Sequence, residues 1–162
     1  MDIQAVLDQR AQAWTRRDAA ALAADYGEEA VVTSPMFPRA EGREAIQASF
    51  EKLFRIFPDW DIAFEEPCIT GNRAMLTGKV RATQRGDFMG MAGSGKRMEF
   101  ECVLILDFEN GLIQRERRIY DFTGVLIQLG VIRGKPAGCG RLSAAISWGS
   151  PAAAGGWNSS AC

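Results

Sequence analysis

The segment 116–130, ERRIYDFTGVLIQLG, combines residues capable of acid–base chemistry with a change in backbone pattern. It begins as a strand-like run, ends that run with Tyr120 and Asp121, and continues as a short apolar helix. A carboxylate at such a junction is held by rigid elements on both sides and can lie at the mouth of a pocket. Asp121 is therefore the predicted catalytic residue. The alternative is that Asp121 only caps the helix 122–129.

The chemistry open to Asp121 depends on its surroundings. The ordinary carboxyl pKa is about 4, which is low for a base at neutral pH. Apolar surroundings would raise this pKa, and a nearby arginine would lower it again. A raised pKa suits removal of a proton next to a carbonyl group. The chain has no histidine, so acid–base chemistry must use carboxylates, Tyr, Lys, Cys or water.

Glu116, Arg118 and Tyr120 lie two residues apart, so they share one face of a strand unless a bulge intervenes. Asp121 then belongs to the opposite face, and a bulge before it would bring it to the side of Tyr120. A face that holds Glu, Arg and Tyr is either the polar wall of a pocket or an exposed surface with ion pairs. The sequence leaves both interpretations open.

Aromatic residues of other elements are further candidates for a ligand pocket. Trp14 and Tyr26 each combine a ring with a polar tip that can meet a ligand. Most aromatic side chains in such positions are simply core residues. The predicted pocket comprises Trp14, Tyr26, Phe37, Trp60, Glu116, Arg118 and Tyr120.

Helical periodicity dominates the first third of the chain, and strand-like alternation dominates the rest. Helices followed by a run of strands predict an α+β fold, with the helices packed on one face of an antiparallel sheet. Helices are expected at 2–16, after Asp18 as far as Gly27, at 42–57 and at 122–129, and strands at 30–34, 61–69, 74–84, 98–108 and 112–121.

The segment 85–97, RGDFMGMAGSGKR, matches most of the phosphate-loop pattern GxxxxGK. Arg97 follows in place of Ser or Thr, and a strand follows in place of the helix that a phosphate loop requires. We therefore interpret this segment as a hairpin connection with a mobile tip.

Composition and charge restrict the class of protein. The chain has 162 residues, a net charge of −1 and 47% hydrophobic residues, which is typical of one globular domain without attraction to nucleic acid. Its four cysteines form no CxxC pair, so no metal site is expected. No stretch reaches the about 20 apolar residues that span a membrane, and the first residues show no signal core. A cytoplasmic location is expected.

Residues 1–133 are expected to form the folded domain. The segment 134–162 is rich in Gly, Ala and Ser and carries few charges. We interpret it as a C-terminal tail that is poorly ordered or loosely docked.

Several motifs together resemble the SnoaL-like polyketide cyclase and ester cyclase branch of the nuclear transport factor 2-like superfamily. These motifs are TSPMFPRAEGREAI, FPDW, the GDFMG…GSGKRMEFE hairpin and ENGLIQRERRIYDFTGVLIQLG. The resemblance covers about residues 1–133. It implies a cone: a curved antiparallel or mixed sheet wrapped around three N-terminal helices, with a short C-terminal helix.

In SnoaL-like cyclases the aspartate before the last helix is the general acid/base of a ring closure, and Asp121 matches that position. The helper histidine of the family has no counterpart here. The resemblance implies a cofactor-free enzyme that binds an apolar carbonyl compound and uses a carboxylate for proton transfer, in a cyclisation or isomerisation. The alternative is a non-catalytic module of the same fold that binds small molecules or dimerises. A homodimer is expected by the same resemblance.

Overall fold

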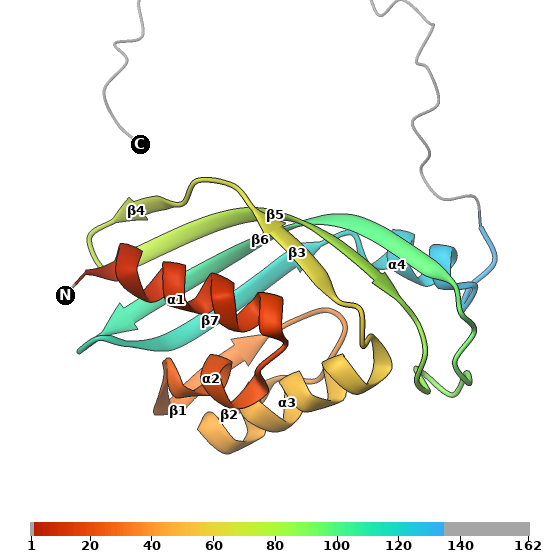
Figure 1. Cartoon of the computed structure of the whole chain (residues 1–162), viewed down its shortest axis with the longest axis horizontal. Helices are drawn as coiled ribbons and strands as arrows, with labels where there is room; N and C mark the ends of the chain where they lie inside the picture. Colours follow the sequence, from red (N-terminus) through yellow and green to blue (C-terminus); the bar gives the residue numbers. More distant parts are fainter. Residues whose placement is uncertain (1, 135–162) are drawn as a thin grey trace, which may run out of the picture.

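The computed structural model describes residues 2–134, which form a seven-stranded mixed sheet with three helices on one face (Figure 1). The expected α+β class is therefore confirmed. The helices are α1 (Ile3–Arg16), α2 (Ala19–Ala24), α3 (Arg43–Ile56) and α4 (Phe122–Leu129). The strands are β1 (Tyr26–Thr33), β2 (Ala40–Glu41), β3 (Asp61–Phe64), β4 (Cys68–Thr70), β5 (Arg73–Thr83), β6 (Arg97–Glu109) and β7 (Leu112–Tyr120).

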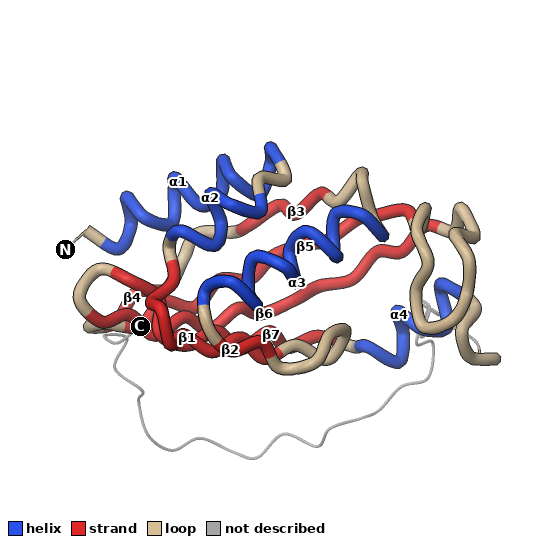
Figure 2. Tube along the Cα trace, turned by 90° about the horizontal axis from the view of Figure 1, so that it is seen from below, coloured by secondary structure: helices blue, strands red, loops and turns tan. Residues whose placement is uncertain are grey.

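Helices α1, α2 and α4 begin after an aspartate that caps them, whereas α3 begins after Gly42, without a side-chain cap. Asp2 accepts the Ala5 amide at the start of α1, and Asp18 accepts the Ala21 amide at the start of α2. Helix α3 buries one apolar face that includes Phe50. Figure 2 shows α1, α2 and α3 together on one side of the sheet, so that their apolar faces meet the inner face of the strands.

The sheet has the strand order β2-β1-β7-β6-β5-β3, and β4 pairs with the end of β5. Strand β1 runs parallel to β7, and the other pairs are antiparallel. Strands β5 and β6 form the longest ladder, which pairs Arg73 with Asp107 at one end and Thr83 with Arg97 at the other. Along both strands buried and exposed residues alternate, so every second side chain faces the helices.

The structure differs from the sequence-based expectation in three places, of which the first is the short strand β2, where no strand was predicted. The strand expected over 61–69 is divided into β3 and β4, because Pro67 has no amide hydrogen for the ladder. Strand β1 begins at Tyr26, earlier than expected, so Gly27 lies within it rather than closing α2. A Cβ atom at Gly27 would lie 2.5 Å from Oε1 of Gln114. The absence of a side chain at Gly27 therefore leaves room for the Gln114 side chain of β7.

The connection between β5 and β6 is organised by the fully buried amide of Gln84. Its Nε2 donates to the carbonyl oxygens of Gly86, Met91 and Ala92 at 3.2, 3.4 and 3.3 Å, and its Oε1 accepts from Ser94 Oγ at 2.8 Å. The connection is thus folded around one side chain rather than held only at its two ends.

The predicted tail, apart from Gly134, lies outside the described residues. Within residues 2–134, no helix is long and apolar enough to cross a membrane. Cys68 and Cys102 are free thiols.

Candidate functional site

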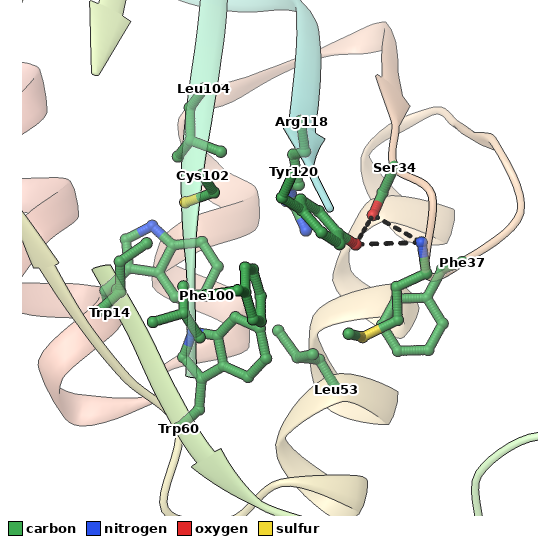
Figure 3. A pocket seen from close by; sticks show the side chains of 13 residues that line it. Trp14, Ser34, Phe37, Leu53, Trp60, Phe100, Cys102, Leu104, Arg118 and Tyr120 are labelled. Carbon is green, nitrogen blue, oxygen red and sulfur yellow. Dashed lines mark hydrogen bonds between the residues drawn. The ribbon is translucent and has the colours of Figure 1, made fainter. Parts of the chain in front are cut away.

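A narrow cavity lies between the helices and the inner face of the sheet. Its volume is about 30 Å³, which is room for about one or two water molecules. The rings of Trp14 and Trp60 lie on one side and Ser34 on the other, and the Phe100 ring lies against the Tyr120 ring, 4.7 Å between their centres (Figure 3). The remaining wall residues are Met36, Phe37, Leu53, Ile62, Val80, Cys102, Leu104 and Arg118. The wall is therefore mainly apolar, with few polar groups.

The Tyr120 hydroxyl is the centre of a polar cluster on this wall. It lies 2.9 Å from Ser34 Oγ, and it accepts the Met36 amide hydrogen at 3.1 Å (Figure 3). Burial raises the pKa of Tyr120 above its ordinary value, so the group is a neutral phenol at pH 7. Because Met36 already donates to this oxygen, the phenolic hydrogen is available to Ser34 or to an oxygen atom of a ligand.

A network of buried charges lies behind the wall. The fully buried Glu116 carboxylate accepts hydrogen bonds from Arg10 Nη2 at 2.9 Å, from the Tyr26 hydroxyl and from Arg118 Nε. Arg10 also donates to Leu22 O at 3.1 Å. Both oxygens of Glu116 are thus engaged. A carboxylate surrounded by donors holds its partners in fixed positions.

The charges of this network stabilise one another. Burial alone would raise the pKa of Glu116, but the Arg118 and Arg10 guanidinium groups hold it below the ordinary value. Burial alone would lower the pKa of Arg118, but the facing Glu116 carboxylate raises it overall. Glu116 is therefore an anion and Arg118 a cation at pH 7. In the same surroundings, burial raises the pKa of Tyr26 well above its ordinary value.

Three cavity residues carry buried N–H groups without an acceptor among the described residues. They are Nε1 of Trp14, Nε1 of Trp60 and Nη2 of Arg118. Buried donors are normally paired, so each such group requires an explanation. Within the same part of the chain, no carboxylate belongs to the cavity wall. The Cys102 thiol on the wall is also a weak acid here, because burial raises its pKa to about 11.

No cluster of three potential metal ligands occurs in residues 2–134. The polar groups of the wall are hydroxyl, indole and guanidinium groups, most of which donate hydrogen bonds. This set suits an oxygen-bearing organic ligand.

The model of the SnoaL-like polyketide cyclase family matches residues 4–129. The chain belongs to this family. The resemblance drawn from its motifs is therefore confirmed.

Solved structures of other proteins are similar to this SnoaL-like protein. AclR, a proposed hydroxylase from Streptomyces galilaeus, has a TM-score of 0.71 and 22% identity over 83% of this chain and 84% of its own. TsrD from Streptomyces laurentii has a TM-score of 0.71 and 21% identity, over 82% of this chain and 99% of its own. IdmH, a proposed polyketide cyclase from Streptomyces antibioticus, has a TM-score of 0.65 and 20% identity, over 80% of this chain and 99% of its own. No protein with a curated description matches the sequence. At these identities the similarity establishes only that the proteins share a fold. An NTF2-like protein from Burkholderia pseudomallei has the same fold.

The pocket residues predicted for this SnoaL-like protein fall into two groups. Five line the cavity, and two lie fully buried behind its wall. The lining residues are Trp14, Phe37, Trp60, Arg118 and Tyr120. Tyr26 and Glu116 contact Arg10 rather than the cavity, because their polar atoms are paired with one another and with the arginines.

Asp121 lies outside the cavity wall. Its side chain is exposed, and its Oδ1 accepts the Gly124 amide at 2.9 Å at the start of α4. No bulge separates it from Tyr120, which pairs with Cys102 in regular register. Among the described residues, Oδ2 accepts no hydrogen bond. The catalytic role of Asp121 stays a prediction, and the capping role is visible in the structure.

Sequence reasoning missed Arg10 and Ser34. Arg10 occupies the apolar face of α1 with Leu7 and Trp14, where a charged residue indicates a buried partner. That signal was available. Ser34 follows β1 with no pattern that distinguishes it from an ordinary loop serine.

Proposed function

We propose that this SnoaL-like protein binds an apolar carbonyl compound in the cavity and polarises its oxygen for proton transfer at the adjacent carbon. The reaction class is cyclisation or isomerisation. The observation that carries this proposal is the combination of an apolar wall with the Tyr120 hydroxyl and the Arg118 guanidinium. Donors that face a developing oxyanion lower the barrier to its formation.

Binding requires movement of the wall. A carbonyl compound with one aromatic ring exceeds the about 30 Å³ of the cavity. Met36 and Phe37 lie on the short segment between β1 and β2, and Met36 has a flexible side chain. We propose that these two side chains move outward when a ligand enters. The Met36 amide keeps its hydrogen bond to the Tyr120 oxygen, and the phenolic hydrogen turns to the carbonyl oxygen of the ligand.

The proton acceptor in this proposal is Asp121, as the family resemblance implies. Its Oδ1 serves the helix cap, which leaves Oδ2 for a proton. Asp121 lies with Lys79 and Glu99 beside the exposed face of the sheet, so the proposal requires a ligand that contacts Tyr120 and extends beyond the cavity wall to this carboxylate.

Acetophenone tests both parts of the proposal. It has one carbonyl group, one apolar ring and exchangeable methyl hydrogens. Calorimetry measures binding, and proton NMR in deuterium oxide measures exchange of the methyl hydrogens. We expect saturable binding and exchange faster than in buffer alone. Absence of binding contradicts the proposal.

The variant Asp121→Asn tests the carboxylate, and Asp18→Asn is its matched control. Both aspartates cap a helix, and asparagine retains that function. We expect Asp121→Asn to slow exchange at least tenfold and Asp18→Asn to leave it unchanged. Equal exchange rates in all three proteins would remove Asp121 from the mechanism.

A second candidate function is binding without catalysis. The absence of a carboxylate from the cavity wall in residues 2–134 favours it. Acetophenone binding without accelerated exchange would establish this second function in place of the first.

Homodimerisation is a separate prediction, based on the family resemblance. Met75 and Ile119 are exposed apolar residues on the outer face of the sheet, at 43% and 49% exposure. Light scattering would test it, and we expect twice the mass of one chain. A monomer across the micromolar range would contradict it.

A further inference from the structure

The buried layer behind the cavity contains two guanidinium groups and one fully buried carboxylate. Arg10 and Arg118 share the single Glu116 carboxylate. Asp25 approaches Arg10 at 3.4 Å, but it is partly exposed and has no recorded contact with Arg118. Buried charges are normally paired or neutralised. Among the described residues, Asp25 gives Arg10 a second anion, whereas Arg118 has Glu116 alone, and only its Nε donates to that carboxylate.

The guanidinium group of Arg118 also belongs to the cavity wall. Arg118 directs Nε to Glu116, and its Nη2 is buried without an acceptor in the described part of the chain. Its guanidinium carbon lies 5.8 Å from the ring centre of Trp14 and 5.0 Å from that of Phe50. Rings interact with a guanidinium through their faces, but they cannot replace a hydrogen-bond acceptor. The guanidinium thus keeps an unused donor among apolar neighbours.

The other groups near Arg118 do not supply a negative charge. Tyr26 and Tyr120 are neutral phenols at pH 7, since burial raises the pKa of each. Cys102 is a neutral thiol for the same reason. Arg10 is a second cation, bonded to the other oxygen of the same carboxylate. Within residues 2–134, no further anion belongs to this wall.

We propose that the cavity selects ligands that carry a negatively charged oxygen on an apolar body, and that Arg118 binds this oxygen. The inference rests on the proposed function. It narrows the substrate class from neutral carbonyl compounds to carboxylates and enolates. A charge-assisted hydrogen bond to Arg118 is stronger than a neutral one. Glu116 acts as a positioning residue, because it holds the guanidinium by Nε and leaves Nη2 for the ligand.

Two pairs of small ligands test the charge preference of the cavity. Each pair consists of an anion and a neutral compound of similar size and shape. The first pair is benzoate and benzamide, and the second is 4-nitrophenolate and 4-nitroanisole, measured at a pH at which the phenol is ionised. Calorimetry gives both dissociation constants of each pair. We expect the anion to bind at least tenfold more tightly in at least one pair. A preference for benzoate indicates a carboxylate ligand, and a preference for 4-nitrophenolate indicates an enolate.

Arg118→Met and Arg117→Met are the matched variants. Arg117 is the neighbouring arginine, but it is exposed and does not belong to the cavity wall. We expect Arg118→Met to abolish the tenfold preference and Arg117→Met to retain it. If Arg118→Met does not fold, the affinities of the unmodified protein within the two ligand pairs still test the proposal. Equal affinity within both pairs, or no binding of either anion, overturns the proposal.

The outcome for acetophenone separates this inference from the proposed function. Acetophenone binding without an anion preference contradicts the inference alone. An anion preference without acetophenone binding contradicts the neutral carbonyl ligand of the proposed function and supports the role of Arg118.

Discussion

Tyr120 and Asp121 are consecutive in the chain but belong to different parts of the molecule. The Tyr120 hydroxyl lies in the cavity wall, 2.9 Å from Ser34 Oγ, whereas the Asp121 carboxylate is exposed and accepts the Gly124 amide at 2.9 Å. The regular register of β7 separates them, because successive side chains leave a strand on opposite faces. Variants at these two positions should therefore change different properties.

Replacing Asp121 by alanine should lower the free energy of unfolding by about 1 kcal/mol, because the helix loses its N-terminal cap. Asp121→Asn should change it little, since the amide oxygen can still accept the Gly124 hydrogen. Denaturant unfolding of the two variants measures the difference. Equal loss in both would contradict the capping role.

The variant Tyr120→Phe should weaken acetophenone binding by about twofold to thirteenfold, because one neutral hydrogen bond contributes about 0.5–1.5 kcal/mol. Calorimetry measures the change. Ethylbenzene provides the matched ligand, since it has the same ring and no oxygen, and its affinity should be the same in both proteins. An equal loss for both ligands would indicate altered packing instead of a lost hydrogen bond.

Glu116→Gln should lower the free energy of unfolding by about 3–5 kcal/mol, because it leaves the buried Arg118 without an anion and Arg10 with Asp25 alone. The control is Glu99→Gln, whose carboxylate forms exposed ion pairs with Lys79 and Arg81 and should matter far less. Urea unfolding at pH 7 compares the two. Similar losses would show that the buried network contributes no more than surface pairs do.

The pH dependence of stability should change in the same variant. The folded protein holds the pKa of Glu116 below its ordinary value, so the unfolded chain binds a proton first as the pH falls. This contribution is complete above the unfolded pKa of about 4.3 and is lost as the pH falls through the lower, folded value. Unfolding curves between neutral and acidic pH should show a shallower decline for Glu116→Gln than for the wild type. An identical decline would mean that other groups cause it.

Gln84→Ala should destabilise the connection between β5 and β6, because three backbone carbonyl groups lose their shared donor. We expect a loss of about 2 kcal/mol in unfolding free energy and faster proteolytic cleavage within residues 85–96. Gln12→Ala, at an exposed position of α1, is the control and should change neither. Unchanged cleavage in Gln84→Ala would show that the connection does not depend on this amide.

Local sequence signals predicted most of the elements. Three helix starts follow an aspartate whose side chain accepts the amide three residues later, namely Asp2, Asp18 and Asp121. Strand alternation predicted the bounds of β5, β6 and β7 to within about a residue or two. Such signals work because the atoms involved are close in the chain. The division of β3 from β4 was missed, although Pro67 was visible, because a single proline also occurs at the edge of an uninterrupted strand.

The sequence by itself determined that Glu116, Arg118 and Tyr120 share one face of a strand. It did not determine whether that face meets the helices or the solvent, since alternation fixes relative sides only. Tertiary packing decided this: it brought Arg10 to Glu116 across 106 positions of the chain and left Asp121 in solvent. A carboxylate shared by two arginines depends on contacts between distant segments, and those contacts exist only after helix and sheet have packed together.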